Sequence, residues 1–555
     1  MKSIFKNYWR KAAFFFIAFA CISISLDLRA EDYTVTVTEP GQLENAVSQL
    51  VGGSDNYHLI TSLTVIGNLN QADITFMQDL GTLQSQGGLG ILEDLDISQT
   101  NLPSNTLPAF AFSYVGIKNI ILPNSVETYE WQCFFNSEVE YVKIGLATSV
   151  VFEDPTPYYN SMDYTAFSNT REMMAYEVEP GNTHFVSVDG VLYTKDMKIL
   201  VAYPSNKPDN TFTIPEAVEK ISFSAMSNTR NLNSLTLLNS LKTISDYAFL
   251  GSNGISNINW GTGLEIIGYK AFMVAKGLGE VVLPEGLTTI ASSAFYSAAI
   301  TKITGPSTLV TLGYDCFRGD GFDGTPLETV DFTNCTNLVT LTEGTFYDCH
   351  YLKNVMLPEG LQVIGNASFQ NCYSIVEMTI PNSVLTIEYN AFWMFSEMYI
   401  HKMERLVLGT GLQEIQANAF GECGNLVEIQ SRNAVPPVLA NDGFEAEINN
   451  KATLYVPMGS LNAYQTANRW RDFNHIVEST VGINDHSLTQ SNYRIYSSMN
   501  RLVIENAKPD DIANIYSTTG SLVKTVRISS TIEEITLPCG VYVVRINNYS
   551  SKVVM

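Results

Sequence analysis

The chain has 555 residues, more than the roughly 250–300 residues that one hydrophobic core supports. It must therefore form several domains or a repeat array. Charged residues make up only 16% of the chain, hydrophobic residues reach 45%, and the net charge is −24. Such an acidic chain repels a phosphate backbone, so we expect no binding to nucleic acid. Its apolar content also excludes a disordered chain.

Residues 1–30 have the pattern of a secretory signal peptide. Basic residues come first, an apolar run extends from Ala12 to Ile24, and Ala30 ends a candidate cleavage site. The run is shorter than the roughly 20 residues that span a membrane. A lipoprotein that carries its lipid on Cys21 is the alternative. Cleavage after Ala30 would remove five basic residues and one acidic residue, and would change the net charge from −24 to −28.

An Ala-Phe pair, or a close variant of it, recurs about every 23 residues through the middle of the chain. Such a fixed period indicates a repeat architecture. Weaker copies are Cys133-Phe134, Ala166-Phe167 and Ala225-Met226. The strong copies are Ala248-Phe249, Ala271-Phe272, Ala294-Phe295, Cys316-Phe317, Thr345-Phe346, Ser368-Phe369, Ala391-Phe392 and Ala419-Phe420.

The repeating unit reads L-x-x-V-x-L-P-x-x-L-x-x-I-x-x-x-A-F, as in the segment from Leu278 to Phe295. This spacing of leucines is typical of one coil of a leucine-rich repeat. One coil cannot bury its apolar face alone, so the coils must stack. We therefore predict a β-rich leucine-rich-repeat solenoid with parallel strands, little helix and a right-handed coil. Its Phe rings should form a continuous internal stack.

Seven cysteines follow the signal segment, and an odd number scattered over a long chain does not indicate a disulfide framework. Cys133 and Cys316 occupy the small position before a Phe, whereas Cys349, Cys372 and Cys423 each follow their Phe by three residues. We predict that they are buried small side chains. A metal site of Cys349, His350 and Cys372 is an alternative, although it lacks a C-x-x-C pair.

Three further segments carry a family resemblance. They are LITSLTVIGNLNQADITFMQDL at residues 59–80, VDGVLYTKDMKILVAYP at residues 188–204, and ATLYVPMGSLNAYQTANRWRDFNHIVE at residues 452–478. With the Ala-Phe units, they make residues 33–480 resemble the BspA-like leucine-rich-repeat family of bacterial surface proteins.

The resemblance implies a division of the chain into modules. Residues 31–108 would form an N-terminal cap and the first repeat, with helices expected at 41–51 and 70–84 from the apolar periodicity. Residues 109–480 would be repeats, with an insertion hairpin near 178–210 and a terminal capping repeat at 433–480. In that last repeat, Tyr464, Trp470 and Phe473 would cover the open end of the core.

The composition changes after Glu478, and the Ala-Phe repeat stops. We predict a polar linker at 481–492 and a small β-sandwich at 493–555, because alternating apolar segments recur there. The motifs Ile515-Tyr516-Ser517, Leu537-Pro538 with Gly540-Val541-Tyr542, and Lys552-Val553-Val554 resemble the sorting domain of the type IX secretion system of Bacteroidetes. This resemblance implies that the secretion machinery is a partner.

The sequence contains no recognisable catalytic motif, so we expect no enzyme, no cofactor and no metal site. The acidic segment GDGFDG, from Gly319 to Gly324, is similar to a fragment of a calcium loop. It lacks the spaced acidic run and the closing Glu of an EF-hand. We interpret it as a glycine-rich insertion in a lengthened repeat.

Binding is the function that the pattern favours. In L-x-x-V-x-L, strand alternation points the second, third and fifth residues outward, and stacking aligns them into columns. These mixed columns suit an extracellular protein or glycan, so we expect a secreted or cell-surface, adhesin-like monomer that binds host or bacterial macromolecules. Alternatives are a structural surface protein without a specific ligand and a glycan-binding accessory protein. A second exposed candidate is the hairpin around Tyr193 and Tyr203. The candidate binding face is Asn119, Tyr141, Lys143, Asn257, Asn259, Glu280, Lys302, Asp331, Asn354, Met356, Glu377, Arg405 and Glu428.

Overall fold

The structure is a computed structural model that describes residues 31–82, 87–89, 91–151, 165–167, 169–322, 324–395 and 401–479 of the repeat part. In the C-terminal part it describes residues 494–498, 501–505, 511–517, 521–530, 532–538, 541–546 and 549–554. The signal segment and the linker predicted at 481–492 lie outside these ranges. The chain divides into a repeat unit that ends at Val477 and a C-terminal unit that begins at Glu478 and includes Pro457–Gly459.

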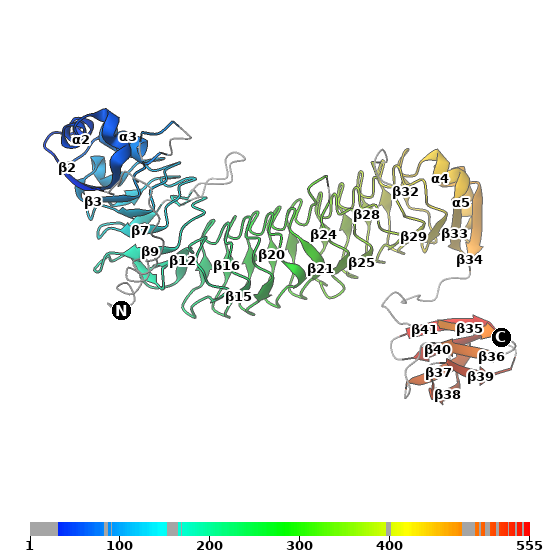
Figure 1. Cartoon of the computed structure of the whole chain (residues 1–555). Helices are drawn as coiled ribbons and strands as arrows, with labels where there is room; N and C mark the ends of the chain where they lie inside the picture. Colours follow the sequence, from blue (N-terminus) through cyan, green and yellow to red (C-terminus); the bar gives the residue numbers. More distant parts are fainter. Residues whose placement is uncertain are drawn as a thin grey trace, which may run out of the picture. The chain divides into compact units, whose positions relative to one another are not determined.

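The repeat unit is a parallel β-solenoid with little helix, which confirms the predicted fold class (Figure 1). Each regular coil contributes two short strands to two different sheets. In the repeats, the first strand comes from the segment L-x-x-V-x-L. The first strands form four sheets.

In order of pairing, these sheets contain β1 Glu31–Val37, β2 Ile60–Asn68, β3 Asp94–Asn101, β5 Asn119–Ile121, β7 Tyr141–Ile144 and β9 Ala175–Val178; then β13 Thr211–Thr213, β15 Ser234–Thr236 and β17 Asn257–Asn259; then β19 Gly279–Val282, β21 Ile300–Thr304, β23 Thr329–Asp331 and β25 Asn354–Met356; then β27 Glu377–Thr379, β29 Arg405–Leu408, β31 Glu428–Ser431, β33 Thr453–Pro457 and β34 His475–Ser479.

The second strand of each coil is usually only two residues long and precedes the Ala-Phe pair. Its brevity follows from the proline and glycine corners that flank it, because these residues do not continue a strand. The second-strand sheets contain β4 Thr106–Leu107, β6 Thr128–Tyr129 and β8 Val150–Val151; then β10 Phe185–Val188, β11 Val191–Thr194, β12 Ile199–Ala202, β14 Lys220–Ile221, β16 Thr243–Ile244, β18 Ile266–Ile267, β20 Thr289–Ile290 and β22 Thr311–Leu312; then β24 Thr340–Leu341, β26 Val363–Ile364, β28 Thr386–Ile387, β30 Glu414–Ile415 and β32 Val438–Leu439.

The Phe side chains of the Ala-Phe pairs stack through the middle of the solenoid, as predicted. Rings of neighbouring coils lie nearly parallel, with centroids 5.1 Å apart for Phe272 and Phe295 and 5.3 Å apart for Phe295 and Phe317. The stack runs without a break from Phe249 to Phe444. The residue before each Phe is small because its side chain shares this fully buried space.

The backbone around each Ala-Phe pair forms a tight turn with its own hydrogen-bond ladder. The residue before the pair has a positive φ, as at Tyr247 (57°) and Lys270 (51°), and so does the residue two places after the Phe, as at Val274 (59°). Amides of one turn donate to carbonyls of the next turn, for example Phe249 N to Ala271 O at 2.7 Å. The turn therefore stacks as regularly as the strands do.

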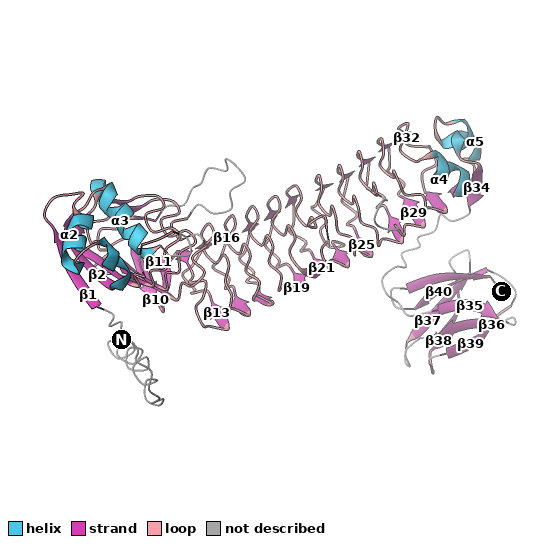
Figure 2. Ribbon diagram, turned by 45° about the horizontal axis from the view of Figure 1, so that its top comes forward, coloured by secondary structure: helices cyan, strands magenta, loops and turns pink. Residues whose placement is uncertain are grey.

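Helices close both ends of the solenoid (Figure 2). At the N-terminal end, α2 spans Leu43–Val51 and α3 spans Gln71–Gly81, close to the predicted ranges, and a 3₁₀ turn, η1, spans Ser54–Leu59. A second 3₁₀ turn, η3, lies at Pro103–Asn105. The buried Asp73 carboxylate accepts backbone amides of Gly41 and Leu43, at 2.7 and 2.9 Å, and so ties α3 to the start of α2.

The C-terminal end of the solenoid is covered by aromatic side chains, as predicted. The elements there are α4 Ala446–Lys451, α5 Leu461–Thr466 and the 3₁₀ turn η4 Trp470–Asp472. Tyr464, Trp470 and Phe473 are buried, and the Trp470 ring lies 6.0 Å from that of Phe444, the last ring of the stack. The stack therefore ends in a cap that shields it from water.

An antiparallel hairpin interrupts the repeats where the sequence predicted an insertion. Strands β10 and β11 pair antiparallel, β12 pairs antiparallel with β11, and β12 then pairs in parallel with β14 of the next coil. The prediction that Tyr193 and Tyr203 are exposed was wrong, since they are only 1% and 4% exposed. Both rings pack into the solenoid core, and that of Tyr203 lies 4.8 Å from that of Phe212.

The hairpin also divides the core. The buried residues before it form one cluster, which contains a shorter stack of Phe112, Phe134 and Phe167, and those after it form a second cluster. Ala202-Tyr203 and Ala225-Met226 occupy this interval, so no Phe ring joins Phe167 to Phe249. The solenoid therefore consists of two separately packed segments.

The C-terminal unit contains two antiparallel sheets. One consists of β35 Arg494–Ser498, β36 Arg501–Glu505 and β39 Ile532–Thr536, and the other of β38 Leu522–Arg527, β37 Ile512–Ser517, β40 Val541–Ile546 and β41 Tyr549–Val554. Leu502 and Ile504 from the first sheet share one buried cluster with Ile515 and Val544 from the second. This unit therefore has a small hydrophobic core of its own.

We predict that Phe295→Ala lowers the free energy of unfolding by about 3–5 kcal/mol, because it leaves a cavity between two stacked rings. The loss should also make unfolding less cooperative, since each coil contacts only its neighbours. Urea unfolding of the full chain measures both effects. Val282→Ala is the matched control, because that side chain is 63% exposed and its loss should change stability little. An equal midpoint for the two variants would contradict the role of the stack.

Candidate binding surfaces

The candidate binding residues predicted from sequence all lie on first strands, one strand per coil. The parallel register pairs them directly: Asn119 faces Tyr141, Glu280 faces Lys302, and Glu377 faces Arg405. We call this surface the strand face. Its predicted members are distributed as Asn119 on β5, Tyr141 and Lys143 on β7, Asn257 and Asn259 on β17, Glu280 on β19, Lys302 on β21, Asp331 on β23, Asn354 and Met356 on β25, Glu377 on β27, Arg405 on β29 and Glu428 on β31.

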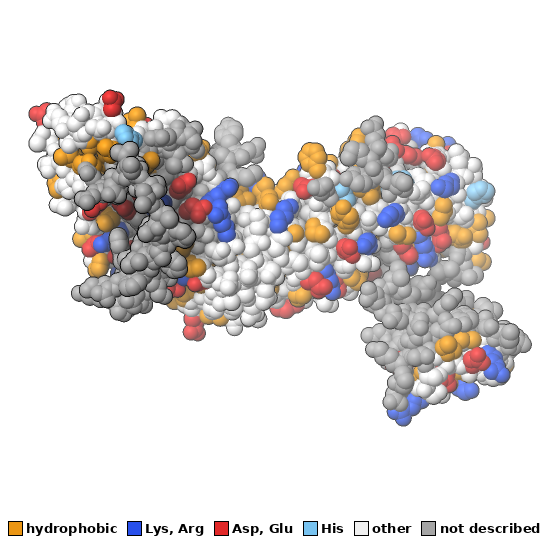
Figure 3. All heavy atoms as spheres, viewed as in Figure 1, with side chains coloured by type: hydrophobic (Ala, Val, Ile, Leu, Met, Phe, Trp, Pro, Cys, Tyr) orange, Lys and Arg blue, Asp and Glu red, His pale blue; other side chains and the backbone are white. Residues whose placement is uncertain are grey.

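The strand face is not one uninterrupted sheet. Hydrogen-bonded pairing stops between β9 and β13, between β17 and β19, and between β25 and β27. The predicted residues therefore fall into four groups, of which the largest spans Glu280 to Met356. All thirteen are exposed or half-buried. Figure 3 shows acidic and basic side chains interspersed with uncharged surface on the visible side of the solenoid.

Several charged side chains of the strand face are held in place by neighbours. Arg405 donates from Nε to Glu428 Oε1 at 2.9 Å and from Nη1 to Glu377 Oε1 at 3.2 Å. Lys143 Nζ lies 2.6 Å from Glu179 Oε2, and this hydrogen bond is the largest cause of the raised pKa of Lys143. Such half-exposed ion pairs contribute little to the stability of the fold. They do fix the positions of positive and negative charges, to which a partner surface can be complementary.

Amide side chains extend the same pattern. Asn119 donates to Asp94 Oδ1 at 2.6 Å, Asn257 to Ser234 Oγ at 3.3 Å, and Asn354 to Thr329 Oγ1 at 3.2 Å. Each of these bonds joins residues at the same register position in adjacent coils. The strand face is thus a polar surface whose side chains are preorganised by neighbouring coils, and it offers both donors and acceptors to a macromolecule.

A second surface, which the sequence analysis did not identify, lies on the outside of the turns that carry the Ala-Phe pairs. We call it the turn edge. Aromatic side chains recur there within two residues of the buried pair: Phe110, Tyr114, Trp131, Phe135, Phe223, Tyr247, Tyr269, Tyr296, Tyr314, Tyr347, Tyr389 and Trp393. Of these only Tyr247 is buried, and Tyr314 is 61% exposed. The sequence contains the signal for this surface, since such a residue flanks most of the aligned pairs, although none flanks Ser368-Phe369 or Ala419-Phe420.

The aromatic side chains of the turn edge contact one another across coils. The Tyr247 ring lies 5.3 Å from that of Phe223 and 5.4 Å from that of Tyr269. Together with Leu250, Met273, Val274 and Tyr296 they form a hydrophobic cluster separate from the solenoid core.

Two cations lie among these rings. Lys270 Nζ is 5.0 Å from the centroid of Tyr269, and the guanidinium carbon of Arg318 is 4.2 Å from that of Tyr347. Cation–π attraction of this kind holds both partners in position.

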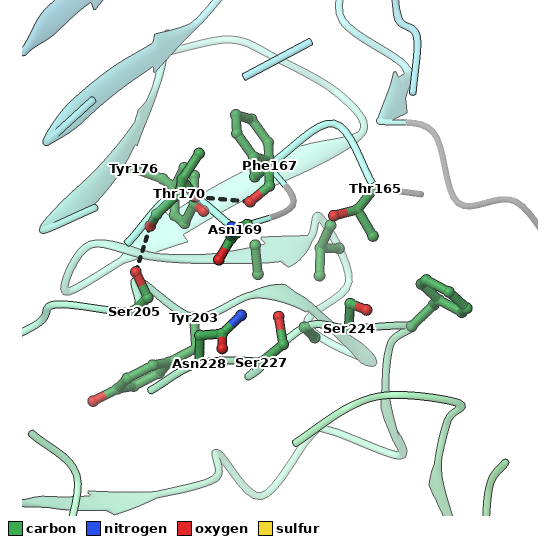
Figure 4. A pocket seen from close by; sticks show the side chains of 14 residues that line it. Thr165, Phe167, Asn169, Thr170, Tyr176, Tyr203, Ser205, Ser224, Ser227 and Asn228 are labelled. Carbon is green, nitrogen blue, oxygen red and sulfur yellow. Dashed lines mark hydrogen bonds between the residues drawn. The ribbon is translucent and has the colours of Figure 1, made fainter. Parts of the chain in front are cut away.

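Two hollows lie beside the insertion hairpin. The first, of about 30 Å³, lies between Thr165, Asn169 and Ser205 on one side and Ser224 and Asn228 on the other (Figure 4). It has room for water rather than for an organic ligand. It occurs where the Phe stack is interrupted.

The second hollow is an open cleft of about 560 Å³ lined by Lys195, Lys198, Lys220, Asp196 and Glu219, among others. Lys198 forms an ion pair with Glu219 at 2.8 Å. Asp196 Oδ1 accepts from Thr194 Oγ1 at 2.7 Å. Acidic and basic groups therefore largely offset one another in this cleft.

Neither of the two metal sites considered from the sequence, at Cys349, His350 and Cys372 and at Gly319–Gly324, is assembled among the described residues. Cys349 Sγ donates to Phe317 O at 3.1 Å and Cys372 Sγ to Phe346 O at 3.2 Å, so both thiols are engaged with backbone. In the Gly319–Gly324 segment, Asp320 Oδ1 accepts the amides of Phe322 and Gly324, while Asp323 lies outside the described residues. Across the residues that the structure describes, no group of three His, Cys, Asp or Glu side chains is placed to hold a metal ion.

The described cysteines are buried and unpaired with one another, as the sequence predicted. Cys423 Sγ donates to Phe392 O at 3.2 Å, in the same manner as Cys349 and Cys372. Burial raises the pKa of Cys335 and of Cys349 to about 12. Cys539 lies outside the described residues. Within the described ranges, no helix combines the length and apolar character needed to cross a bilayer.

A family sequence model described as "BspA type Leucine rich repeat region" matches the chain in six copies, over residues 90–177, 205–321 and 319–438. The interval from 178 to 204 that it leaves unmatched contains the hairpin strands β10, β11 and β12. No curated protein matches the chain at a significant level.

Solved structures of leucine-rich-repeat proteins match parts of the chain. One from Bacteroides ovatus is 18% identical, with 67% of this chain and 79% of that chain covered and a TM-score of 0.40. A leucine-rich cell surface protein from Faecalibacterium prausnitzii is 19% identical, covering 55% and 76%, with a TM-score of 0.37. One from Eubacterium ventriosum is 20% identical, covering 59% and 74%, with a TM-score of 0.34.

We predict that the buried thiols make stability fall at alkaline pH. The unfolded chain ionises its thiols near their ordinary pKa of about 8.5, whereas folded Cys335 and Cys349 stay neutral up to a pKa of about 12. A raised folded pKa means that stability is fully present below the unfolded pKa and is lost as pH rises toward the folded one. The unfolding free energy, measured by urea titration at pH values of about 8 and 10, should therefore decrease.

The matched variant is Cys335→Ala with Cys349→Ala, which should show a smaller decrease than the unaltered chain over the same pH interval. Ionisation of Tyr and Lys is common to both proteins and cancels in this comparison. An identical pH dependence would show that these two thiols are not protected from ionisation.

Proposed function

Because the chain belongs to the BspA-type leucine-rich-repeat family, we propose that it is a secreted or cell-surface protein that binds extracellular macromolecules without catalysing a reaction. The observation that carries this proposal is the strand face, where outward side chains of successive coils stand in register over many strands. An extended solenoid surface of this kind suits a large partner.

The partner we propose is an extracellular protein of host or bacterial origin. The strand face offers both signs of charge, in pairs such as Arg405 with Glu428, and interspersed amide donors. A protein surface presents the complementary mixture, whereas a polyanion would meet the acidic surplus of this chain. This composition supports an adhesin-like role, with the chain acting as a monomer.

The test is binding of the full chain to immobilised extracellular matrix proteins and to bacterial surface extracts, followed by surface plasmon resonance. Lys302→Ala should weaken the binding about threefold to tenfold, since a rim charge at an interface contributes in this range. Lys242→Ala is the matched control, because Lys242 pairs with Glu265 on the second-strand side of the solenoid. Absence of any specific ligand would favour a structural surface protein and contradict the proposal.

We also propose that residues 1–30 direct export and that the C-terminal unit directs sorting to the surface. Two observations support the sorting role: residues 493–555 resemble a type IX sorting domain, and the C-terminal unit has a hydrophobic core of its own. A lipid on Cys21 is the alternative route to the surface.

Deletion of residues 485–555 tests the sorting proposal. In the native host, the shortened chain should be made and exported from the cytoplasm but should no longer reach the cell surface, as measured by protease accessibility on intact cells. A Cys21→Ser variant in the same assay should leave display unchanged. Normal display of the shortened chain would refute the sorting role.

A further inference from the structure

We propose that the turn edge between Phe223 and Tyr347 binds a neutral, linear polysaccharide along the solenoid axis. This inference rests on the proposed function only in that the chain acts outside the cell as a binding protein. It concerns a different surface and a different class of ligand from the strand face.

The first argument is the shape of the turn edge. Six successive coils, from the one with Ala225 to the one with Thr345, each contribute one aromatic side chain beside the buried pair, and all of these except Tyr247 are exposed or half-buried. At the start of this row, the Tyr247 ring lies 5.3 Å from that of Phe223 and 5.4 Å from that of Tyr269, close to the roughly 4.8 Å between adjacent strands. The result is a row of aromatic side chains, one from each coil. A chain-like ligand can follow such a strip over its length, whereas a globular protein interface of roughly 800 Å² per partner needs a broader surface.

The second argument is the chemistry of the strip. Tyr269, Tyr296 and Tyr347 are half-buried, and Tyr314 is 61% exposed, so their rings present apolar surface with a hydroxyl at one end. The C–H faces of sugar rings pack against aromatic rings, and sugar hydroxyls need donors and acceptors nearby. Ser292, which is half-buried, lies beside the rings, and its Oγ accepts the Tyr314 amide at 3.1 Å.

The third argument is the rigidity of the rings. Lys270 lies over both Tyr247 and Tyr269, at 5.8 and 5.0 Å, and Arg318 lies over Tyr296 and Tyr347, at 5.9 and 4.2 Å. Each cation thus links the rings of two coils. A platform whose side chains are already ordered loses little further conformational freedom when a ligand binds.

The fourth argument is charge. Along this part of the turn edge, three cations (Lys270, Lys276 and Arg318) lie among five acidic residues (Asp246, Asp315, Asp320, Glu343 and Asp348). Arg318 and Asp315 neutralise one another at 3.4 Å. The strip therefore holds no surplus of cations, and the net charge of the whole chain is −24. A polyanionic glycan would be repelled by the chain and would find no surplus of cations here, so the ligand should be uncharged.

The experiment uses the full chain and affinity electrophoresis in gels that contain xylan, mannan or mixed-linkage β-glucan, with heparin and alginate as polyanionic probes. We expect retardation by at least one neutral polysaccharide and by neither polyanion. Tyr314→Ala and Tyr269→Ala should each weaken this retardation about threefold to tenfold, since a lost ring contact costs that much. Tyr141→Ala, on the strand face, is the matched control and should leave it unchanged.

The outcomes separate the two proposals. Binding to a matrix protein with no retardation by any neutral polysaccharide would overturn the turn-edge inference and leave the proposed function intact. Retardation that Tyr141→Ala abolishes and Tyr314→Ala does not would also overturn it, because the glycan would then lie on the strand face. Retardation by polyanions alone would also overturn the turn-edge inference.

Circular dichroism of each variant shows whether the fold is retained. Tyr314→Phe keeps the aromatic ring and should therefore retain most of the binding.

Discussion

The stack of Phe rings in parallel register is the interaction on which the rest of this structure depends. A coil of about 23 residues has too little apolar surface to fold alone. Its Phe, its Leu and its Ile are buried only when the next coil repeats them at the same positions. Because the rings stack face to face at 5.0 to 5.5 Å along most of the solenoid, each coil is held at one rotation relative to its neighbour. Every other residue in the repeat then forms a column.

The two candidate surfaces are consequences of this register. On the strand face, columns of polar side chains are joined by bonds between adjacent coils, such as that of Arg405 with Glu428. On the turn edge, left-handed residues such as Tyr247 and Lys270 sit beside the buried pair. The same stacking thus generates a polar surface and an aromatic one. The interruption at the hairpin, where the stack is broken, divides both surfaces into segments.

Much of this fold could be predicted from the sequence, since the Ala-Phe period determines the coil, the stack and the first strands. The columns of Asn119 with Tyr141 and of Glu377 with Arg405 followed from strand alternation alone. The burial of Tyr193 and Tyr203 could not be predicted in this way, because the sequence pattern of a hairpin does not show which of its faces packs on the core. The turn edge was missed for a related reason: its rings flank the buried Phe, and only the left-handed backbone on either side turns them outward.

The central claim is that binding uses surfaces that run along many coils in register. Hydrogen exchange, measured by mass spectrometry on the full chain with and without a bound extracellular ligand, tests it most directly. The account predicts slower exchange in successive coils, either at first strands such as β21, β23 and β25 or at the turns from Tyr247 to Tyr347. Protection confined to the N-terminal cap or to the C-terminal unit, with none in successive coils, would contradict it.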